Sequence, residues 1–141
     1  MSETTENEDS EKYLVFSILD RLYSCPSRYI GEIALFDTVY PLPLMPSYVL
    51  GIINRYSVPY ALFDIGMLLY KTPGKQKKVL VLKDEVDRIA FLIDDVEGIV
   101  DVTENTLNSD GTSYNWNGDD VLVLNIQNIL KRVSEETAQS D

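Results

Sequence analysis

Residues 51–65 read GIINRYSVPYALFDI, an apolar stretch that Asn54, Arg55 and Tyr56 interrupt. Its two apolar parts, GIIN and VPYALFDI, contain the β-branched and aromatic residues that strands favour, so the stretch predicts two strands or one interrupted strand. The polar residues in the middle could be an ordinary connection between strands or a surface that contacts other molecules.

Short strand-like segments recur along the rest of the chain. Strands are predicted at 12–19, 22–25, 33–36, 79–85, 87–95, 98–102 and 121–126. The segments 79–85 and 87–95 are expected to form a hairpin joined near Glu85-Val86-Asp87. So many short strands with little helix predict an all-β fold, built as barrels or as a sandwich.

Helices are predicted only at a few places. Pro26 is expected to open a short helical turn that puts Ile30 and Ile33 on one face, and Pro46 a second turn before Gly51. Residues 103–120 are rich in Asn, Ser, Thr, Asp and Gly and are predicted to be mostly loop. Residues 125–136 place apolar side chains at helical spacing, which predicts a short C-terminal helix.

Composition excludes several classes of function. The net charge of −11 is concentrated at the two ends, which are predicted to be disordered and soluble, and it disfavours binding to nucleic acid. No histidine is present, which excludes imidazole catalysis and histidine ligands to zinc. Cys25 is the only cysteine and is expected to be a small packed side chain. With no signal-peptide pattern and no apolar run of membrane-spanning length, we expect a cytoplasmic protein without membrane insertion.

Three groups of side chains could carry chemistry. Four acids, Asp94, Asp95, Glu97 and Asp101, could bind magnesium or calcium, but their spacing fits no calcium loop and solvated edges are favoured. A basic group at 71–78 could meet an acidic partner or simply form a solvated turn. Five of the nine tyrosines lie within residues 29–60, as half-buried barrel residues or as a protein-binding patch. No catalytic constellation or phosphate-binding loop is found, so binding is favoured over catalysis.

The order of several motifs resembles the CheW family, the adaptor domain of bacterial chemosensory arrays. The matching stretches, over about residues 12–131, are YLVFSI, LYSCPSRYIGEI, the Pro46, Gly51, Ile52 and Asn54 pattern, Asp64-Ile65, FLIDDVEGIVDV and VLVLNIQNIL. Each motif is weak alone, but their order and spacing are specific. The resemblance divides the chain into an acidic tail (1–11), a CheW-like domain of two halves (12–131), and a helix end with an acidic tail (132–141).

The resemblance implies two five-stranded SH3-like barrels side by side, with a short C-terminal helix. It also implies no catalysis, no cofactor and no metal. The implied partners are the regulatory domain of a CheA-type histidine kinase and the cytoplasmic tip of chemoreceptors, which lies in an apolar groove between the barrels. The residues expected to bind partners are Ile30, Glu32, Ile33, Gly51, Asn54, Arg55, Tyr56, Asp94, Val96 and Ile99. The last three are expected to line the second barrel, and 51–65 to belong to the first.

The chain departs from the family pattern in two places. The family follows its asparagine with Leu-Arg-Gly, where this chain has Arg55, Tyr56 and Ser57. Either Tyr56 replaces the family arginine or Arg55 takes its role. The loop before the last strand is also short, so a strand of the second barrel is expected to be short or missing. Two alternatives stay open: a divergent adaptor that binds one partner, for pilus-based motility or as an array spacer, and a metal-binding module or small enzyme that uses the acids at 94–101.

Overall fold

The computed structural model describes residues 10–35, 38–73, 78–83 and 88–139. Most of the predicted N-terminal tail, Lys75 and Lys77 of the basic group, and the connection at 85–87 lie outside the described residues.

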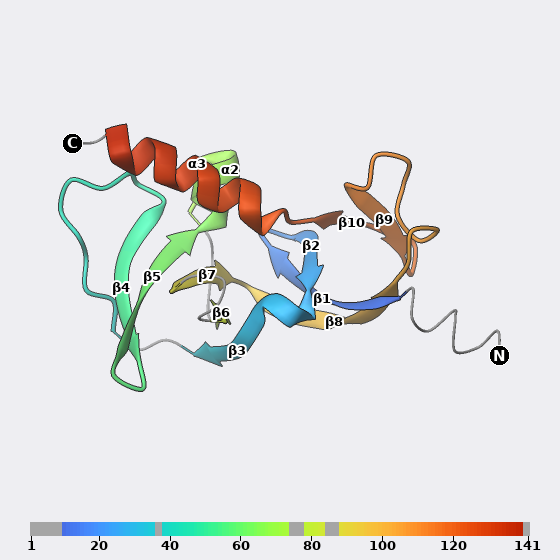
Figure 1. Ribbon diagram of the computed structural model, residues 1–141, viewed down its shortest axis with the longest axis horizontal. Coiled ribbons are helices and arrows are strands. Elements are labelled where there is room, and N and C mark those ends of the chain that lie inside the picture. The colour runs from blue at the N-terminus through green and yellow to red at the C-terminus, as the bar shows by residue number, and fades with distance from the viewer. Residues whose placement is uncertain (1–9, 36–37, 74–77, 84–87, 140–141) are drawn as a thin grey trace.

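The described strands form two five-stranded sheets (Figure 1). One sheet, here called the terminal barrel, has the order β8 (Asp95–Val102), β1 (Glu11–Ile18), β2 (Arg21–Pro26), β10 (Asp119–Val123) and β9 (Ser113–Trp116). The other, called the central barrel, has the order β3 (Ile30–Leu35), β6 (Lys78–Leu82), β7 (Ile89–Ile93), β5 (Val58–Asp64) and β4 (Val49–Arg55). Each sheet contains one parallel pair, β2 with β10 and β5 with β7, and its other pairs are antiparallel. The prediction of an all-β fold with two five-stranded subdomains and a C-terminal helix is confirmed.

The division of the chain between the barrels differs from the expected one. The strand β8, which carries Val96 and Ile99, pairs with β1 and so shares a barrel with the first two strands of the chain. Residues 51–65 lie in the other barrel, as the hairpin β4–β5. The chain therefore leaves the terminal barrel after β2, builds the whole central barrel, and then returns.

Several local predictions need correction. The turn after Pro26 is the 3₁₀ helix η1 (Ser27–Tyr29), and Ile30 and Ile33 lie on the following strand instead of a helical face. Pro46 opens only a turn, in which Val49 N donates to Pro46 O (2.9 Å). Residues 103–120 are mostly loop, as expected, but they contain β9, so the strand expected to be short or missing is present and is short, with four residues.

The structure also contains a helix that the sequence analysis did not predict, α2 (Ile65–Tyr70). Asp64 caps it by accepting a hydrogen bond from Met67 N (3.1 Å), and Lys71 ends it in a left-handed conformation. The predicted C-terminal helix is confirmed as α3 (Ile126–Gln139), which continues beyond the predicted end.

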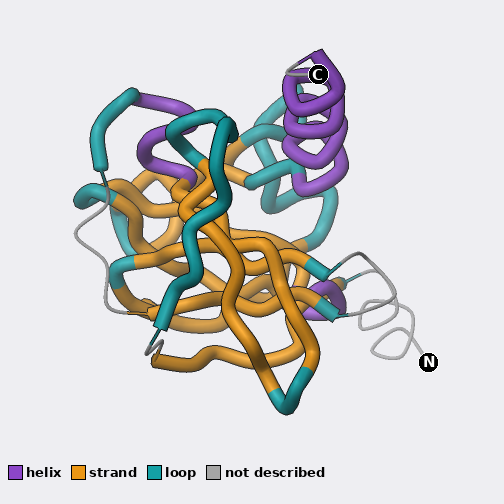
Figure 2. Tube along the Cα trace, turned by 90° about the vertical axis from the view of Figure 1, so that its left-hand side faces the viewer, coloured by secondary structure: helices purple, strands orange, loops and turns teal. Residues whose placement is uncertain are grey.

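Three apolar cores follow from the alternation of side chains along the strands. On β6, Val79 and Val81 point into the central barrel, whereas Leu80 and Leu82 join the largest core, which lies between the two barrels. A third core fills the terminal barrel around Val15. The helix α3 adds apolar side chains to the core between the barrels and lies above the strands (Figure 2). Because both faces of the innermost strands are largely buried, the exposed surface lies mainly on edge strands, turns, loops and the outer side of α3.

Candidate partner-binding surfaces

The predicted residues Glu32 and Arg55 form an ion pair between the two edge strands of the central barrel. Arg55 Nε donates to Glu32 Oε1 (3.0 Å) and the terminal guanidinium nitrogen Nη2 donates to Oε2 (2.9 Å). Both side chains are about three-quarters shielded from solvent, with 27% and 29% exposed. Since β3 and β4 are at opposite ends of the sheet order, this bidentate contact helps to close the barrel.

Arg55 and Glu32 direct their side-chain hydrogen bonds toward each other. The hydrogen bonds to Glu32 raise the pKa of Arg55 above its usual value. The Arg55 guanidinium also lies 5.2 Å from the centre of the Tyr56 ring, a cation–π distance. The charge of Glu32, one of the residues expected to bind partners, is therefore balanced within the chain by Arg55.

Tyr56 lies at the tip of the β4–β5 hairpin and is 84% exposed. Arg55 pairs with Val58, so Tyr56 and Ser57 alone form the turn, and both have positive φ angles (52° and 66°). Positive φ at both central residues is the requirement of a type I′ turn. Arg55 thus points back to the barrel and contacts Glu32, whereas Tyr56 faces solvent.

Asn54 and Gly51 lie on the same strand but in different environments. Asn54 is exposed and lines a cavity of about 220 Å³ between β3 and β4. Gly51 is buried with φ of 143°, and a Cβ there would lie 2.3 Å from Tyr40 O. The close approach is fixed by two 2.8 Å hydrogen bonds between Tyr40 and Ile52. Gly51 therefore has a clear structural reason to be glycine.

Ile30 and Ile33 lie on one side of β3 because of a bulge at Gly31. Residues three apart on a regular strand point to opposite faces. Here the register shifts, so that Ile30 pairs with Leu82 and Ile33 with Leu80, which share one face of β6. Both isoleucines are half-buried and pack against the core between the barrels.

The strand β8 of the terminal barrel contains a bulge with the same effect. Val96 pairs with Phe16 and Ile99 with Leu14, two partners on one face of β1, because a bulge accommodates Glu97. Val96 packs against the core between the barrels, and Ile99 is 62% exposed. Both β3 and β8 run along the side of the molecule away from α3 (Figure 1). We call the set Ile30, Ile33, Val96 and Ile99 the inter-barrel face.

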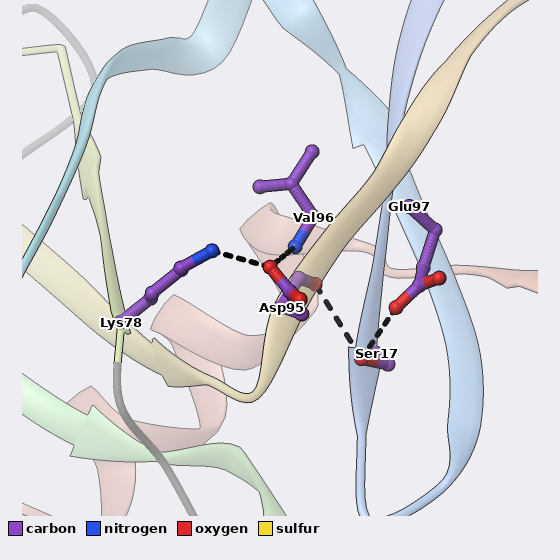
Figure 3. A network of polar contacts seen from close by, with 5 residues as sticks. All are labelled: Ser17, Lys78, Asp95, Val96 and Glu97. Carbon is purple, nitrogen blue, oxygen red and sulfur yellow. Dashed lines mark hydrogen bonds and ion pairs between the residues drawn. The ribbon is translucent and has the colours of Figure 1, made fainter.

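The four acids at 94–101 each have a separate partner. Asp94 Oδ2 accepts from Leu19 N (2.8 Å), and Asp101 accepts from Lys12 Nζ (3.0 Å). Asp95 forms an ion pair with Lys78 of the central barrel, which lowers the pKa of Asp95, and Glu97 accepts from Ser17 Oγ (3.0 Å) (Figure 3). Within the described residues, no group of three or more potential ligands is close enough to hold a metal ion. Among these contacts, the pair of Asp95 with Lys78 links one barrel to the other, whereas Glu97 and Asp101 contact β1 within the terminal barrel.

Several exposed apolar residues were not among the predicted binding residues. Leu35, Tyr40 and Leu44 are 70%, 54% and 93% exposed. Leu44 belongs to PLPLMP, whose prolines indicated a segment outside the sheets but gave no sign of which leucines would be exposed. Trp116 was also missed: it covers Gly98 on the opposite edge strand β8, where a Cβ would lie 3.0 Å from the indole ring. That contact closes the terminal barrel.

Comparison with known proteins agrees with this geometry. Residues 12–134 match the family model described as CheW-like domain. The chain belongs to the CheW-like domain family. The crystal structure of the scaffolding protein TtCheW from Thermoanaerobacter tengcongensis is similar, with a TM-score of 0.74 at 14% identity, covering 83% of this chain and 85% of that one. No curated protein matches the sequence.

This CheW-like chain has, in the part that the structure describes, no helix with the length and hydropathy needed to span a bilayer. Gly51, which is buried against Tyr40, and Asp94, which accepts from Leu19 N, face no common surface, whereas the other predicted binding residues form two groups on opposite sides of β3. The inter-barrel face lies on one side, and Glu32 with the tip of the β4–β5 hairpin lies on the other.

Proposed function

We propose that this CheW-like protein is a non-catalytic scaffold that couples chemoreceptors to a CheA-type histidine kinase in bacterial chemotaxis. The observation that carries the proposal is the inter-barrel face, where bulges on β3 and β8 turn four apolar side chains toward the junction of the barrels. Family membership and the fold of a scaffolding protein support it.

The inter-barrel face suits an apolar helical segment such as a receptor tip. Its side chains come from two separate strands, so a helix can lie along both, and Ile99 supplies exposed apolar area. Helices that bind apolar surfaces present residues at i, i+3, i+4 and i+7 to them. The helix α3 covers the opposite side of the same core and leaves this face free.

The second surface allows a second partner to be held at the same time. Glu32 and Ile33 are adjacent on β3 and face opposite ways, so the hairpin end and the inter-barrel face do not compete for space. We assign the regulatory domain of the kinase and the receptor tip to this pair of surfaces. Holding both raises the local concentration of one near the other, with no chemical step in the scaffold. Such a role places the protein in the cytoplasm.

Binding of the full chain to a kinase regulatory domain and to a receptor tip tests the proposal. Ile99→Asp should abolish receptor binding, because a carboxylate would replace exposed apolar area on the inter-barrel face. Leu44→Asp, an equally drastic change at a remote exposed leucine, is the matched control and should bind as the wild type does. If the wild type binds neither partner at micromolar concentration, the coupling role is wrong.

A second candidate keeps the fold but has one partner. It is favoured by the hairpin tip, where Arg55 is already paired with Glu32 and Tyr56 takes the exposed position. A divergent adaptor of this kind would serve pilus-based motility or act as an array spacer. Tight binding to one partner with none to the other would select it over the coupling role.

A further inference from the structure

The chain joins the two barrels at two short crossings on the side of the inter-barrel face. The first crossing is η1, which lies between the end of β2 at Pro26 and the start of β3 at Ile30. The second is Asp94, the single residue between β7 and β8. Both crossings lead directly into the strands that carry the inter-barrel face. Two points of attachment define an axis, about which one barrel can rotate relative to the other unless further contacts prevent it.

The helix α3 extends from one barrel to the other on the opposite side of the molecule (Figure 1). Its start is fixed to the terminal barrel, because Leu124 N donates to Ser24 O of β2 (2.8 Å). Asn125 Oδ1 accepts from Asn128 N (3.0 Å) and caps the helix. Three side chains at helical spacing bury one face of α3 in the core between the barrels: Ile126, Ile129 and Val133.

The far end of α3 is attached to the central barrel by a polar contact. Tyr48, the residue before β4, donates its hydroxyl to Glu136 Oε1 (2.8 Å), and Arg132 Nε donates to Glu136 Oε2 (2.9 Å). The hydrogen bonds from Arg132 and Tyr48 lower the pKa of Glu136, which keeps the carboxylate charged. The Tyr48 ring is buried and lies 6.4 Å from the Phe63 ring of β5, measured between ring centres, so its hydroxyl is held in place.

This polar contact holds a part of the helix that apolar burial does not. After Val133, Ser134 and Glu135 are exposed and Glu136 is half-buried. Segments with little apolar burial open locally at a lower cost than the core of a protein. The end of α3 can therefore separate from the central barrel while the strands remain folded.

We propose that α3 is a clasp that fixes the angle between the two barrels. With Glu136 on Tyr48, rotation about the two crossings is prevented. With that contact released, the barrels rotate, and the two halves of the inter-barrel face lose their mutual arrangement.

The partner affected is the apolar helical segment of a receptor tip, so this inference rests on the proposed scaffold function. Such a helix contacts β3 and β8 at once, and these strands belong to different barrels. Its affinity is therefore highest when the angle between the barrels is already fixed before binding. By thermodynamic linkage, a partner that prefers the fixed arrangement must in turn hold the end of α3 on the central barrel.

The test is Tyr48→Phe, which removes the hydroxyl and keeps the ring. In the free protein, we expect backbone amides at 132–136 to exchange about tenfold faster, while amides of β7 exchange as in the wild type. Residual dipolar couplings should fit one common orientation of the barrels in the wild type and a different or averaged one in the variant. Affinity for an isolated receptor-tip segment should fall about fivefold, and adding that segment to the wild type should slow exchange at 132–136.

Two further variants locate the effect in the contact itself. Glu136→Ala should reproduce the effects of Tyr48→Phe, and the double variant should be no more affected than either single variant, because both remove the same contact. Glu135→Ala changes the neighbouring exposed glutamate. It is the matched control and should leave exchange, orientation and affinity unchanged.

The outcomes separate the clasp from the function on which it rests. Faster exchange at the end of α3 with an unchanged orientation of the barrels overturns the clasp. Unchanged exchange in Tyr48→Phe overturns it as well, and so does exchange that rises equally in β7, because the loss would then be global. Wild-type protein that binds no receptor tip overturns the scaffold function, whereas the exchange and orientation measurements need no partner and still decide whether α3 is a clasp.

Discussion

The hairpins β4–β5 and β9–β10 occupy corresponding places in the two barrels, but they close their barrels by different contacts. In each, the residue just before the turn reaches the edge strand at the other end of the sheet: Arg55 contacts Glu32, and Trp116 covers Gly98. One barrel is closed by an ion pair and the other by an aromatic ring on glycine. The turns that follow differ as well, Tyr56-Ser57 against Asn117-Gly118.

The difference separates a structural hairpin from one with a second role. In β9–β10 the sequence agrees with the backbone, and Asn115 Oδ1 accepts a further hydrogen bond from Gly118 N (3.2 Å). In β4–β5 the turn residues Tyr56 and Ser57 adopt positive φ angles, which their side chains disfavour. Agreement between local preference and fold is the rule for stable proteins, and exceptions concentrate at functional sites. The strained hairpin is therefore the one expected to meet a partner.

Among the substitutions that test this comparison, Gly98→Val should lower the free energy of unfolding most. The added side chain would collide with Trp116, open the terminal barrel and lower the free energy of unfolding by about 2–3 kcal/mol. Chemical denaturation measures the loss. In a Trp116→Ala background the same substitution should cost little, and an undiminished cost there would show that Trp116 does not close the barrel.

Converting the relaxed turn into the strained sequence should have the next largest effect. Asn117→Tyr with Gly118→Ser would force two unsuited residues into positive φ, at a cost of about 1–2 kcal/mol in unfolding free energy. Thermal unfolding would record the decrease. Binding to both proposed partners should not change. A change in either affinity would show that the β9–β10 hairpin is not purely structural.

Breaking the ion pair of the central barrel should have a smaller effect on stability. Arg55→Ala leaves Glu32 without its partner, but because both side chains retain some exposure the cost should be about 1 kcal/mol. A double-mutant cycle with Glu32→Gln measures the coupling of the two residues by chemical denaturation. Additive effects would show that the pair does not contribute to closing the barrel.

Much of the fold could be predicted from the sequence, since most strands have β-branched runs bounded by turn residues. The interleaved barrels could not, because the pairing of β1 with β8 joins segments that are far apart in the sequence, such as Glu11 and Val102. The strand β9 was hidden in a polar segment, because Tyr114 is its one buried residue and Trp116 is only partly buried against the same core. The helix α2 was signalled by Asp64 before an apolar run, but six residues are too few for a clear helical period.

The sequence allowed individual residues of the candidate site to be predicted, but not the surfaces that these residues form together. Glu32 and Arg55 were both named, yet their contact depends on which strands form the edges of the sheet. The bulge at Gly31 that brings Ile30 and Ile33 to one face leaves no periodic signal in the sequence. The strain at Tyr56 became visible only once its φ angle was known.

The most direct test of the central claim is a paired measurement on Tyr56→Asn/Ser57→Gly: unfolding free energy by denaturation, and affinity for the kinase regulatory domain and the receptor tip by calorimetry. Relief of strain predicts a gain of roughly 0.5–1 kcal/mol in stability. A partner contact at the hairpin end predicts about tenfold weaker binding to one partner. Unchanged stability together with unchanged affinities would contradict the account, because the Tyr56 turn would then be neither strained nor used.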